Sequence, residues 1–136
     1  YYFSDLGLRN SFINFRQQEE THIMENAIYL ELKRRGYQVD VGVVEQRTKE
    51  NDKLAYKQLE IDFIANKGSN KIYIQSAFAM PDEEKRQQEE RPLLKINDSF
   101  KKFIIVKDFI KRWRDEEGII TMSIFDFLLD MESLKY

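Results

Sequence analysis

The chain has 136 residues, enough for one domain with a hydrophobic core, and its composition of 42% hydrophobic and 34% charged residues is ordinary for a globular protein. Its 24 acidic and 22 basic residues give a net charge of −2, which excludes a field over the whole molecule that attracts nucleic acid; any phosphate-binding surface must be a local patch. The lack of cysteine excludes disulfides and thiolate zinc sites, and the single histidine, His22, excludes a site that needs two imidazoles from one chain.

The sequence also bears on location and boundaries. No apolar run approaches the ~20 residues that a helix needs to cross a bilayer. A chain without cysteine fits a reducing compartment, so we expect a cytoplasmic protein with no membrane partner. The chain begins at Tyr1 and not at a methionine, which indicates a part of a longer protein. We expect residues 1–20 to be a lead-in from a preceding region and residues 21–136 to form the domain.

A helix is expected over residues 21–35, because Thr21 is a suitable N-cap and Gly36 a suitable stop. Its broad apolar face is formed by Ile23, Met24, Ala27, Ile28, Leu30 and Leu32. Two acids interrupt that face: at about 100° per residue, Glu31 falls near its middle and Glu25 at its edge. A buried partner or a functional role as a ligand would each explain Glu31, and the pattern leaves both open.

A strand is expected over residues 37–44, where valines alternate with other residues. The next segment, residues 47–58, is charged and shows no periodicity. We therefore expect an exposed, mobile loop there, with solvated side chains.

Residues 59–78 hold two apolar, alternating runs that are joined by a turn-forming cluster at residues 66–70, which predicts a β-hairpin. Alternation places Ile61 and Phe63 on one face of the first strand and Asp62 on the other. An acid in such an apolar strand is costly to bury without a partner. Asp62 is therefore expected either to lie at a solvated strand end or to bind something.

A polar helix is expected over residues 83–91, with Asp82 as its N-cap and Pro92 at its end. Pairs of opposite charge four residues apart, such as Lys85 and Glu89, stabilise it modestly. Because this helix is polar nearly all round, it is expected either to be exposed or to lie against a partner.

Two short apolar runs, residues 103–106 and 119–122, predict buried strands. Ser123 and Asp126 form a capping-box pattern at the start of a last helix. The apolar residues of that helix are Ile124, Phe127, Leu128 and Met131.

Basic side chains surround the strand at residues 103–106, and Trp113 lies among them in the sequence. The candidate nucleic-acid-binding residues are Lys101, Lys102, Lys111, Arg112 and Arg114. Three acids follow at residues 115–117, so a simple solvated surface is the alternative.

The predicted order is helix, strand, strand, strand, helix, strand, with Glu25 on the first helix and Asp62 on the middle strand. Two carboxylates brought together by folding can hold Mg²⁺, which keeps several waters and needs few protein ligands. Such an ion can polarise a phosphodiester and lower the pKa of an attacking water, and a positioned lysine then stabilises the developing negative charge.

Several stretches resemble a known family. Residues 24–37, 60–64 and 74–77 are similar to the core of the PD-(D/E)xK nucleases. More narrowly, the chain resembles a C-terminal domain of uncharacterised function that follows an AAA-type ATPase module in many bacterial and archaeal ATP-binding proteins. This second resemblance rests on residues 3–10, 25–32, 89–93 and 118–119. It implies an α/β fold with a restriction-endonuclease-like core of three layers (helix, mixed β-sheet, helix; order αβββαβ) and N- and C-terminal additions.

The catalytic positions of that family carry over one by one. Glu25 matches the acid of the first helix and Asp62 matches the central metal-binding aspartate. The resemblance implies that these two carboxylates bind Mg²⁺ or Mn²⁺. The family's (D/E)-x-K motif falls on Gln75, Ser76 and Ala77. Gln75 offers a neutral amide in place of a carboxylate, and Ala77 offers no cation in place of the lysine. The resemblance therefore implies a degenerate site. It would hold a metal weakly and provide no cation to stabilise the negative charge that develops in the transition state.

The phosphate-binding motif G-x-x-x-x-G-K-[ST] does not occur in the chain, so ATP is expected only in an N-terminal ATPase module, the implied partner. Three hypotheses follow. The first is a catalytically inactive, nuclease-like accessory domain that regulates the larger ATP-binding protein and binds nucleic acid or a protein partner. The second is a Mg²⁺- or Mn²⁺-dependent DNA nuclease with a displaced catalytic lysine. The third is a pure protein-interaction domain.

Overall fold

The computed structural model describes residues 17–136, so most of the expected lead-in lies outside the described residues. The elements are α2 (Gln17–Arg34), β1 (Gln38–Glu50), β2 (Lys53–Lys67), β3 (Asn70–Ala77), α3 (Glu83–Leu94), β4 (Lys101–Val106), β5 (Trp113–Arg114), β6 (Ile120–Ser123), α4 (Ile124–Leu129) and the 3₁₀ helix η1 (Ser133–Lys135). The predicted order of helix, three strands, helix and strand is found from α2 to β4. Within residues 17–136, none of the helices has the length and apolar character that crossing a membrane requires.

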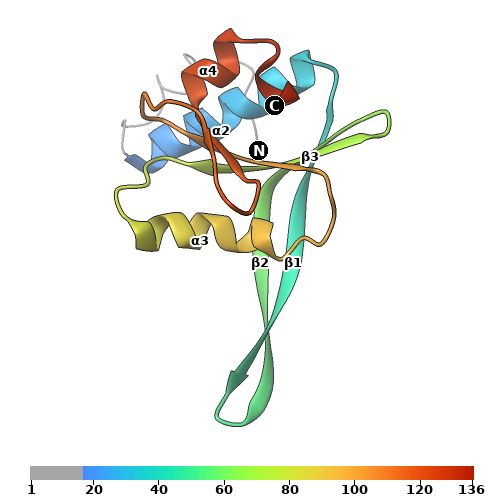
Figure 1. Ribbon diagram of the computed structural model, residues 1–136, viewed down its shortest axis with the longest axis vertical. Coiled ribbons are helices and arrows are strands. Elements are labelled where there is room, and N and C mark those ends of the chain that lie inside the picture. The colour runs from blue at the N-terminus through green and yellow to red at the C-terminus, as the bar shows by residue number, and fades with distance from the viewer. Residues whose placement is uncertain (1–16) are drawn as a thin grey trace.

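The six strands form one mixed sheet in the order β1-β2-β3-β4-β6-β5. The pairs β3–β4 and β4–β6 are parallel, and the other three pairs are antiparallel. Figure 1 shows α2 and α4 on one side of the sheet and α3 on the other. One hydrophobic cluster, with Leu32 and Phe63, fills the side of α2 and α4, and a second, with Leu93 and Ile104, lies under α3. The fold is thus α/β, with an open mixed sheet that is covered on both faces.

The first helix begins before its predicted start at Thr21. Thr21 lies inside α2 and not at its N-cap, and residues 17–20 are helical. Glu19 and Glu20 in the first turn favour this earlier start, because negative charge is stabilised at a helix N-terminus. The end is as predicted: Gly36 has a φ of +88°, and the N–H of Tyr37 reaches back to a carbonyl of the last turn, as in a Schellman motif.

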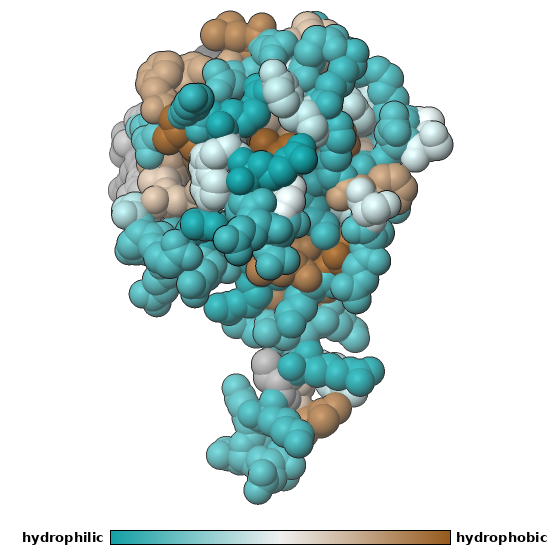
Figure 2. All heavy atoms as spheres, viewed as in Figure 1, coloured by the Kyte–Doolittle hydropathy of each residue, from teal (hydrophilic) through white to brown (hydrophobic). Residues whose placement is uncertain are grey.

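The loop predicted for residues 47–58 is wrong, because β1 and β2 continue there as a two-stranded ribbon. This hairpin arm, residues 45–58, projects from the body of the molecule (Figure 1) and ends in a two-residue turn. Asn51 and Asp52 in that turn both have positive φ, 50° and 59°, as the type I′ turn of a tight hairpin requires. The arm leaves the body, so no core faces it and no apolar periodicity marks its strands. Figure 2 shows mainly hydrophilic side chains on it, with a few hydrophobic ones.

A β-bulge in β2 places Ile61 and Phe63 on opposite faces of the sheet, whereas strict alternation predicted that they share one face. The pairing passes from Asp40 opposite Ile64 to Gly42 opposite Ile61, so two residues of β2 face one residue of β1. As a result Ile61 packs in the cluster under α3, whereas Phe63 packs in the cluster under α2. Gly42 is required here, because a Cβ at this position would lie 2.4 Å from the Cδ1 of Ile64.

The helices α3 and α4 begin at the capping residues that the sequence predicted. Asp82 caps α3 by accepting a hydrogen bond from the backbone N–H of Lys85 at 2.8 Å, and Ser123 caps α4 by accepting one from Phe125 at 3.2 Å. Pro92 lies inside the last turn of α3 and not at its end, and Met131 lies beyond the last residue of α4.

Candidate functional site

Asp62 lies in the bulge of β2, at the point where β2 and β3 separate. The regular β2–β3 ladder ends at the pair Phe63–Ile74. Beyond it, two side chains replace ladder hydrogen bonds. The Oε1 atom of Gln75 accepts a hydrogen bond from the backbone N–H of Asp62, and Asp62 Oδ2 accepts one from the backbone N–H of Ser76, both at 2.8 Å. The predicted pair Asp62 and Gln75 is thus brought together, as a bridge between the two strands.

Three further carboxylates lie close enough to this bridge to act on the charge of Asp62. Burial raises the pKa of Asp62 to about 7, and the negative charges of Glu25, Glu89 and Glu60 act in the same direction against the opposing hydrogen bond from Ser76. Burial also raises the pKa of Glu25, which lies 3.7 Å from the Nδ1 atom of His22. The predicted first-helix acid therefore does lie near Asp62. In residues 17–136, however, no three acidic, histidine or cysteine side chains form a group that could hold a metal ion.

The two positions at which the catalytic motif is degenerate are both buried. Gln75 is 4% exposed and has its amide oxygen committed to Asp62. Ala77 is 1% exposed and packs in the cluster under α3, so a lysine placed there would have to enter that cluster. On α3, the Nζ atom of Lys85 pairs with Glu89 at 2.6 Å.

The acid that interrupted the apolar face of α2 has a structural partner. Glu31 accepts hydrogen bonds from the side chains of Arg34 and Arg35, at 2.7 to 2.9 Å. Arg35 in turn donates to Ser133 and to the backbone carbonyls of Phe127 and Asp130, which ties α2 to the C-terminal segment. Of the two explanations left open for Glu31, the structure thus favours the buried ion pair.

The predicted nucleic-acid-binding residues gather beside the short edge strand β5. Lys101, Lys102 and Arg114 line one hollow of about 330 Å³, and Lys111, Arg112 and Arg114 line a second of about 410 Å³. Both hollows share Arg114, Ile120 and Tyr136. We name this surface the β5 edge. The acids Asp98 and Glu117 also line the first hollow.

The five cations of the β5 edge are not equivalent. Lys102 donates to the backbone carbonyl of Ile96 at 2.8 Å, and the Arg112 guanidinium lies 3.7 Å from the ring centre of Tyr136. Lys101, Lys111 and Arg114 are exposed, and within the described residues no ion pair or side-chain hydrogen bond engages them. These three are the cations that the surface presents to an anionic ligand.

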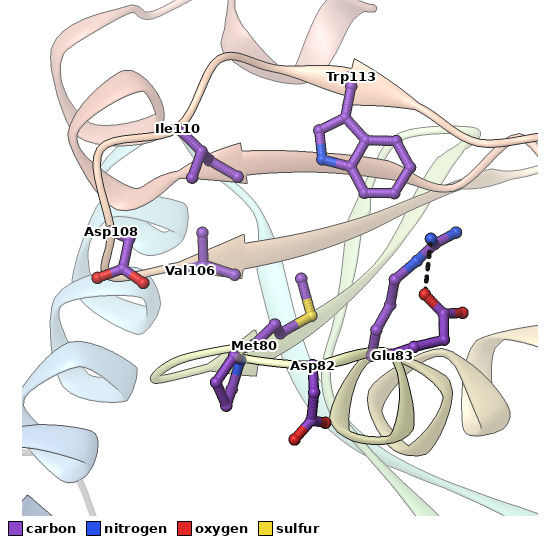
Figure 3. Close-up of a pocket in the computed structure, with 9 residues that line it drawn as sticks. Met80, Asp82, Glu83, Val106, Asp108, Ile110 and Trp113 are labelled. Carbon is purple, nitrogen blue, oxygen red and sulfur yellow. Dashed lines mark hydrogen bonds and ion pairs between the residues drawn. The ribbon is translucent and has the colours of Figure 1, made fainter.

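Trp113 connects the β5 edge to α3. Its ring lines the second hollow of the β5 edge and also a hollow of about 300 Å³ beside the start of α3, where it faces Met80, Ile110 and Glu83 (Figure 3). The guanidinium of Arg86 lies 4.6 Å from the ring centre, and its Nε donates to Glu90 at 2.6 Å. This contact holds β5 against the body of the domain.

Sequence reasoning missed Glu60, Glu89 and His22 as neighbours of the site. Glu89 was visible only as half of a charge pair on a polar helix. No local pattern indicates that α3 turns this carboxylate toward β2, because that depends on how the helix crosses the sheet.

The fold and the site together define a mixed α/β domain with an aspartate in a strand junction near other carboxylates, and with a basic edge. No family model matches the chain. It is similar to an uncharacterised protein of Haemophilus influenzae, with 33% identity over 129 residues. The matched region is 95% of this chain but 28% of that protein, so the chain spans little more than a quarter of the length of its relative.

Proposed function

We propose that this chain is a non-catalytic accessory domain with a restriction-endonuclease-like core, which serves a longer AAA-type ATP-binding protein and binds nucleic acid at the β5 edge. The order of elements from α2 to β4 and the helices on both faces of a mixed sheet support the core assignment. The match to one part of a longer relative is in keeping with an accessory role. Fold alone does not define function, so the proposal depends on the chemistry of the strand junction and of the β5 edge.

The strand junction supports an inactive site. Phosphodiester hydrolysis needs a cation or donor placed where negative charge develops. The motif positions instead hold a glutamine and an alanine. The side-chain oxygen of Gln75 already accepts a hydrogen bond from the backbone N–H of Asp62, and Ala77 is buried in the core. The remaining carboxylates crowd one another without a preformed metal group among the described residues.

The observation that carries the binding proposal is the meeting of Lys101, Lys111 and Arg114 around two adjoining hollows. Trp113 is 37% exposed and Tyr136 is 54% exposed at the same place. Cations beside exposed aromatic rings are the usual means of binding phosphates and bases together.

Binding of nucleic acid at the β5 edge is expected to weaken as the salt concentration rises. With about three phosphate contacts, the slope of log K against log salt concentration is expected to be about −2 to −3. Arg114→Gln should weaken binding at all sequences and make the slope shallower by about one. Fluorescence anisotropy with labelled single-stranded and duplex oligonucleotides between 50 and 200 mM salt measures both quantities.

Lys53→Gln serves as the control, because Lys53 is an exposed cation at the start of β2, beside the opposite edge of the sheet. It should leave the slope unchanged. Absence of binding at 50 mM salt, or equal losses in the two variants, would reject the β5 edge as a nucleic-acid site.

The second candidate function is a Mg²⁺- or Mn²⁺-dependent DNA nuclease that uses Glu25 and Asp62. The raised pKa of Asp62 favours it, since neighbouring carboxylates that repel each other attract a divalent cation. If a metal bound, the free oxygen of Asp62 and the carboxylate of Glu25 would hold it, and it would polarise a phosphodiester there.

Calorimetric titration with Mn²⁺ separates the two candidates. We expect no saturable binding to the wild-type chain, because Gln75 contributes no charge and its oxygen is engaged. One ion per chain, lost in Asp62→Asn, would contradict the inactive site and make a cleavage assay the next measurement.

A further inference from the structure

The strand β1 forms one edge of the sheet, and over its 13 residues it pairs only with β2 in the part of the chain that the structure describes. Its turn has two residues, so Glu50 and Lys53 on either side of it form a hydrogen-bonded pair. Hydrogen-bonded and non-bonded pairs alternate along an antiparallel ladder. The backbone N–H and C=O groups of Val43, Glu45 and Arg47 therefore point outward, away from β2.

One face of β1 and of the hairpin arm carries four exposed apolar side chains among its charged and polar ones. Val43 and Val41 alternate along β1, and cross-strand pairing places Tyr56 and Leu54 of β2 on the same face, opposite Arg47 and Lys49. These four apolar side chains, the arm stripe, are 55–60% exposed. A two-stranded hairpin is marginally stable in water, whereas three or more strands with an apolar face are stable. The hairpin arm has only two strands, so it lacks the neighbouring strands that would stabilise its apolar face.

We propose that β1 pairs with β1 of a second copy of this chain, antiparallel and about a two-fold axis at Gln46. A two-fold axis makes the same residues meet in both directions. In this register Glu45 lies opposite Arg47 of the second copy, and Arg47 opposite its Glu45. Opposite charges stabilise directly facing positions, whereas like charges destabilise them.

The neighbouring registers are less favourable. An axis at Glu45 brings the two Glu45 side chains together, an axis at Arg47 brings the two Arg47 side chains together, and an axis at Thr48 sets Arg47 opposite Lys49. Within residues 43–49, only the axis at Gln46 sets opposite charges face to face and no like ones. It also makes the outward-pointing residues 43, 45, 47 and 49 hydrogen-bonded pairs, as their backbone geometry requires.

The consequence is a ribbon of four strands in the order β2-β1-β1-β2, with the arm stripe of each copy on the same face. This assembly supplies the additional strands that the isolated arm lacks. It does not involve the β5 edge, which lies at the opposite edge of the sheet.

Charge reversal tests the register. Sedimentation equilibrium of the 136-residue chain should give a monomer–dimer equilibrium. Glu45→Arg and Arg47→Glu should each weaken dimerisation at least about tenfold, because each sets like charges opposite one another twice. The double variant exchanges the charges and should recover the wild-type association. A wild-type chain that stays monomeric, or a double variant no better than the single ones, overturns the proposal.

A cysteine placed on the axis gives a second readout, on a chain without any cysteine of its own. Gln46 would meet itself as a non-bonded pair with about 4.5 Å between Cα atoms, within the range that a disulfide spans. Gln46→Cys should therefore cross-link into a covalent dimer under mild oxidation. Lys57→Cys, on the strand behind Gln46, should not. Equal cross-linking of both variants, or none in Gln46→Cys, would overturn the proposed pairing of β1 with β1.

Discussion

Replacing Asp62 by asparagine is expected to raise the free energy of unfolding at pH 8 by about 1–3 kcal/mol. The pKa of this carboxyl rises from its usual 3.8 to about 7, mainly through burial. At pH 8 the folded chain therefore carries a buried charge near Glu25, Glu60 and Glu89, at a cost of up to about 4 kcal/mol. Asparagine removes this charge and its cost. Its side-chain oxygen can still accept the hydrogen bond from Ser76, so the loss of the carboxylate acceptor offsets only part of the gain in stability.

The same change predicts a difference in pH dependence. Between pH 4 and 7 the folded chain binds the proton of Asp62 more tightly than the unfolded chain does, so Asp62 lowers stability as pH rises through this range. Below about pH 4 the carboxyl is protonated in both states and the contribution vanishes. The stability difference between Asp62→Asn and wild type should therefore grow from pH 4 to 7 and then level off.

Urea unfolding of both proteins at several pH values measures this difference and cancels the other titrating groups. Asp108→Asn is the control, because it makes the same substitution at an exposed aspartate in the loop after β4. A loss of stability in Asp62→Asn at pH 8 would mean that the charged carboxylate contributes more through the Ser76 hydrogen bond than its burial costs.

Glu31→Gln is expected to lower the free energy of unfolding by about 3 kcal/mol. Glu31 is 8% exposed and pairs with Arg35, which is equally buried. Removing one member of a buried ion pair leaves the other charge without compensation, which typically costs 3–5 kcal/mol. Arg35 keeps its backbone acceptors in the C-terminal segment, which places the estimate at the low end of this range.

Glu20→Gln is the matched control on the same helix. Glu20 pairs with Lys107 at 3.3 Å, but the two side chains are 34% and 51% exposed, and such pairs contribute about 0–1 kcal/mol. Urea unfolding at pH 7 compares the two variants. Equal small losses would show that Arg35 is held by its carbonyl and hydroxyl acceptors alone, and not by the charge of Glu31.

The sequence by itself determined the features that depend on neighbouring residues. The stop at Gly36 and the caps at Asp82 and Ser123 follow from local backbone chemistry, and the structure has all three. The first helix and the strands from β1 to β4 followed from apolar patterns, whereas α3 followed from its N-cap and its charge pairs. The basic residues of the β5 edge could be named because they lie close together along the chain.

Only the tertiary structure decided the features that depend on register and on packing partners. The bulge in β2 separates Ile61 from Phe63, since one extra residue reverses the facing that strict alternation predicts. The hairpin arm carries no periodic pattern because no core lies against it. The closeness of Glu89 to Asp62 arises from the crossing of α3 over the sheet. Local sequence encodes where an element begins and ends, whereas the surroundings of a carboxylate are set by elements distant along the chain.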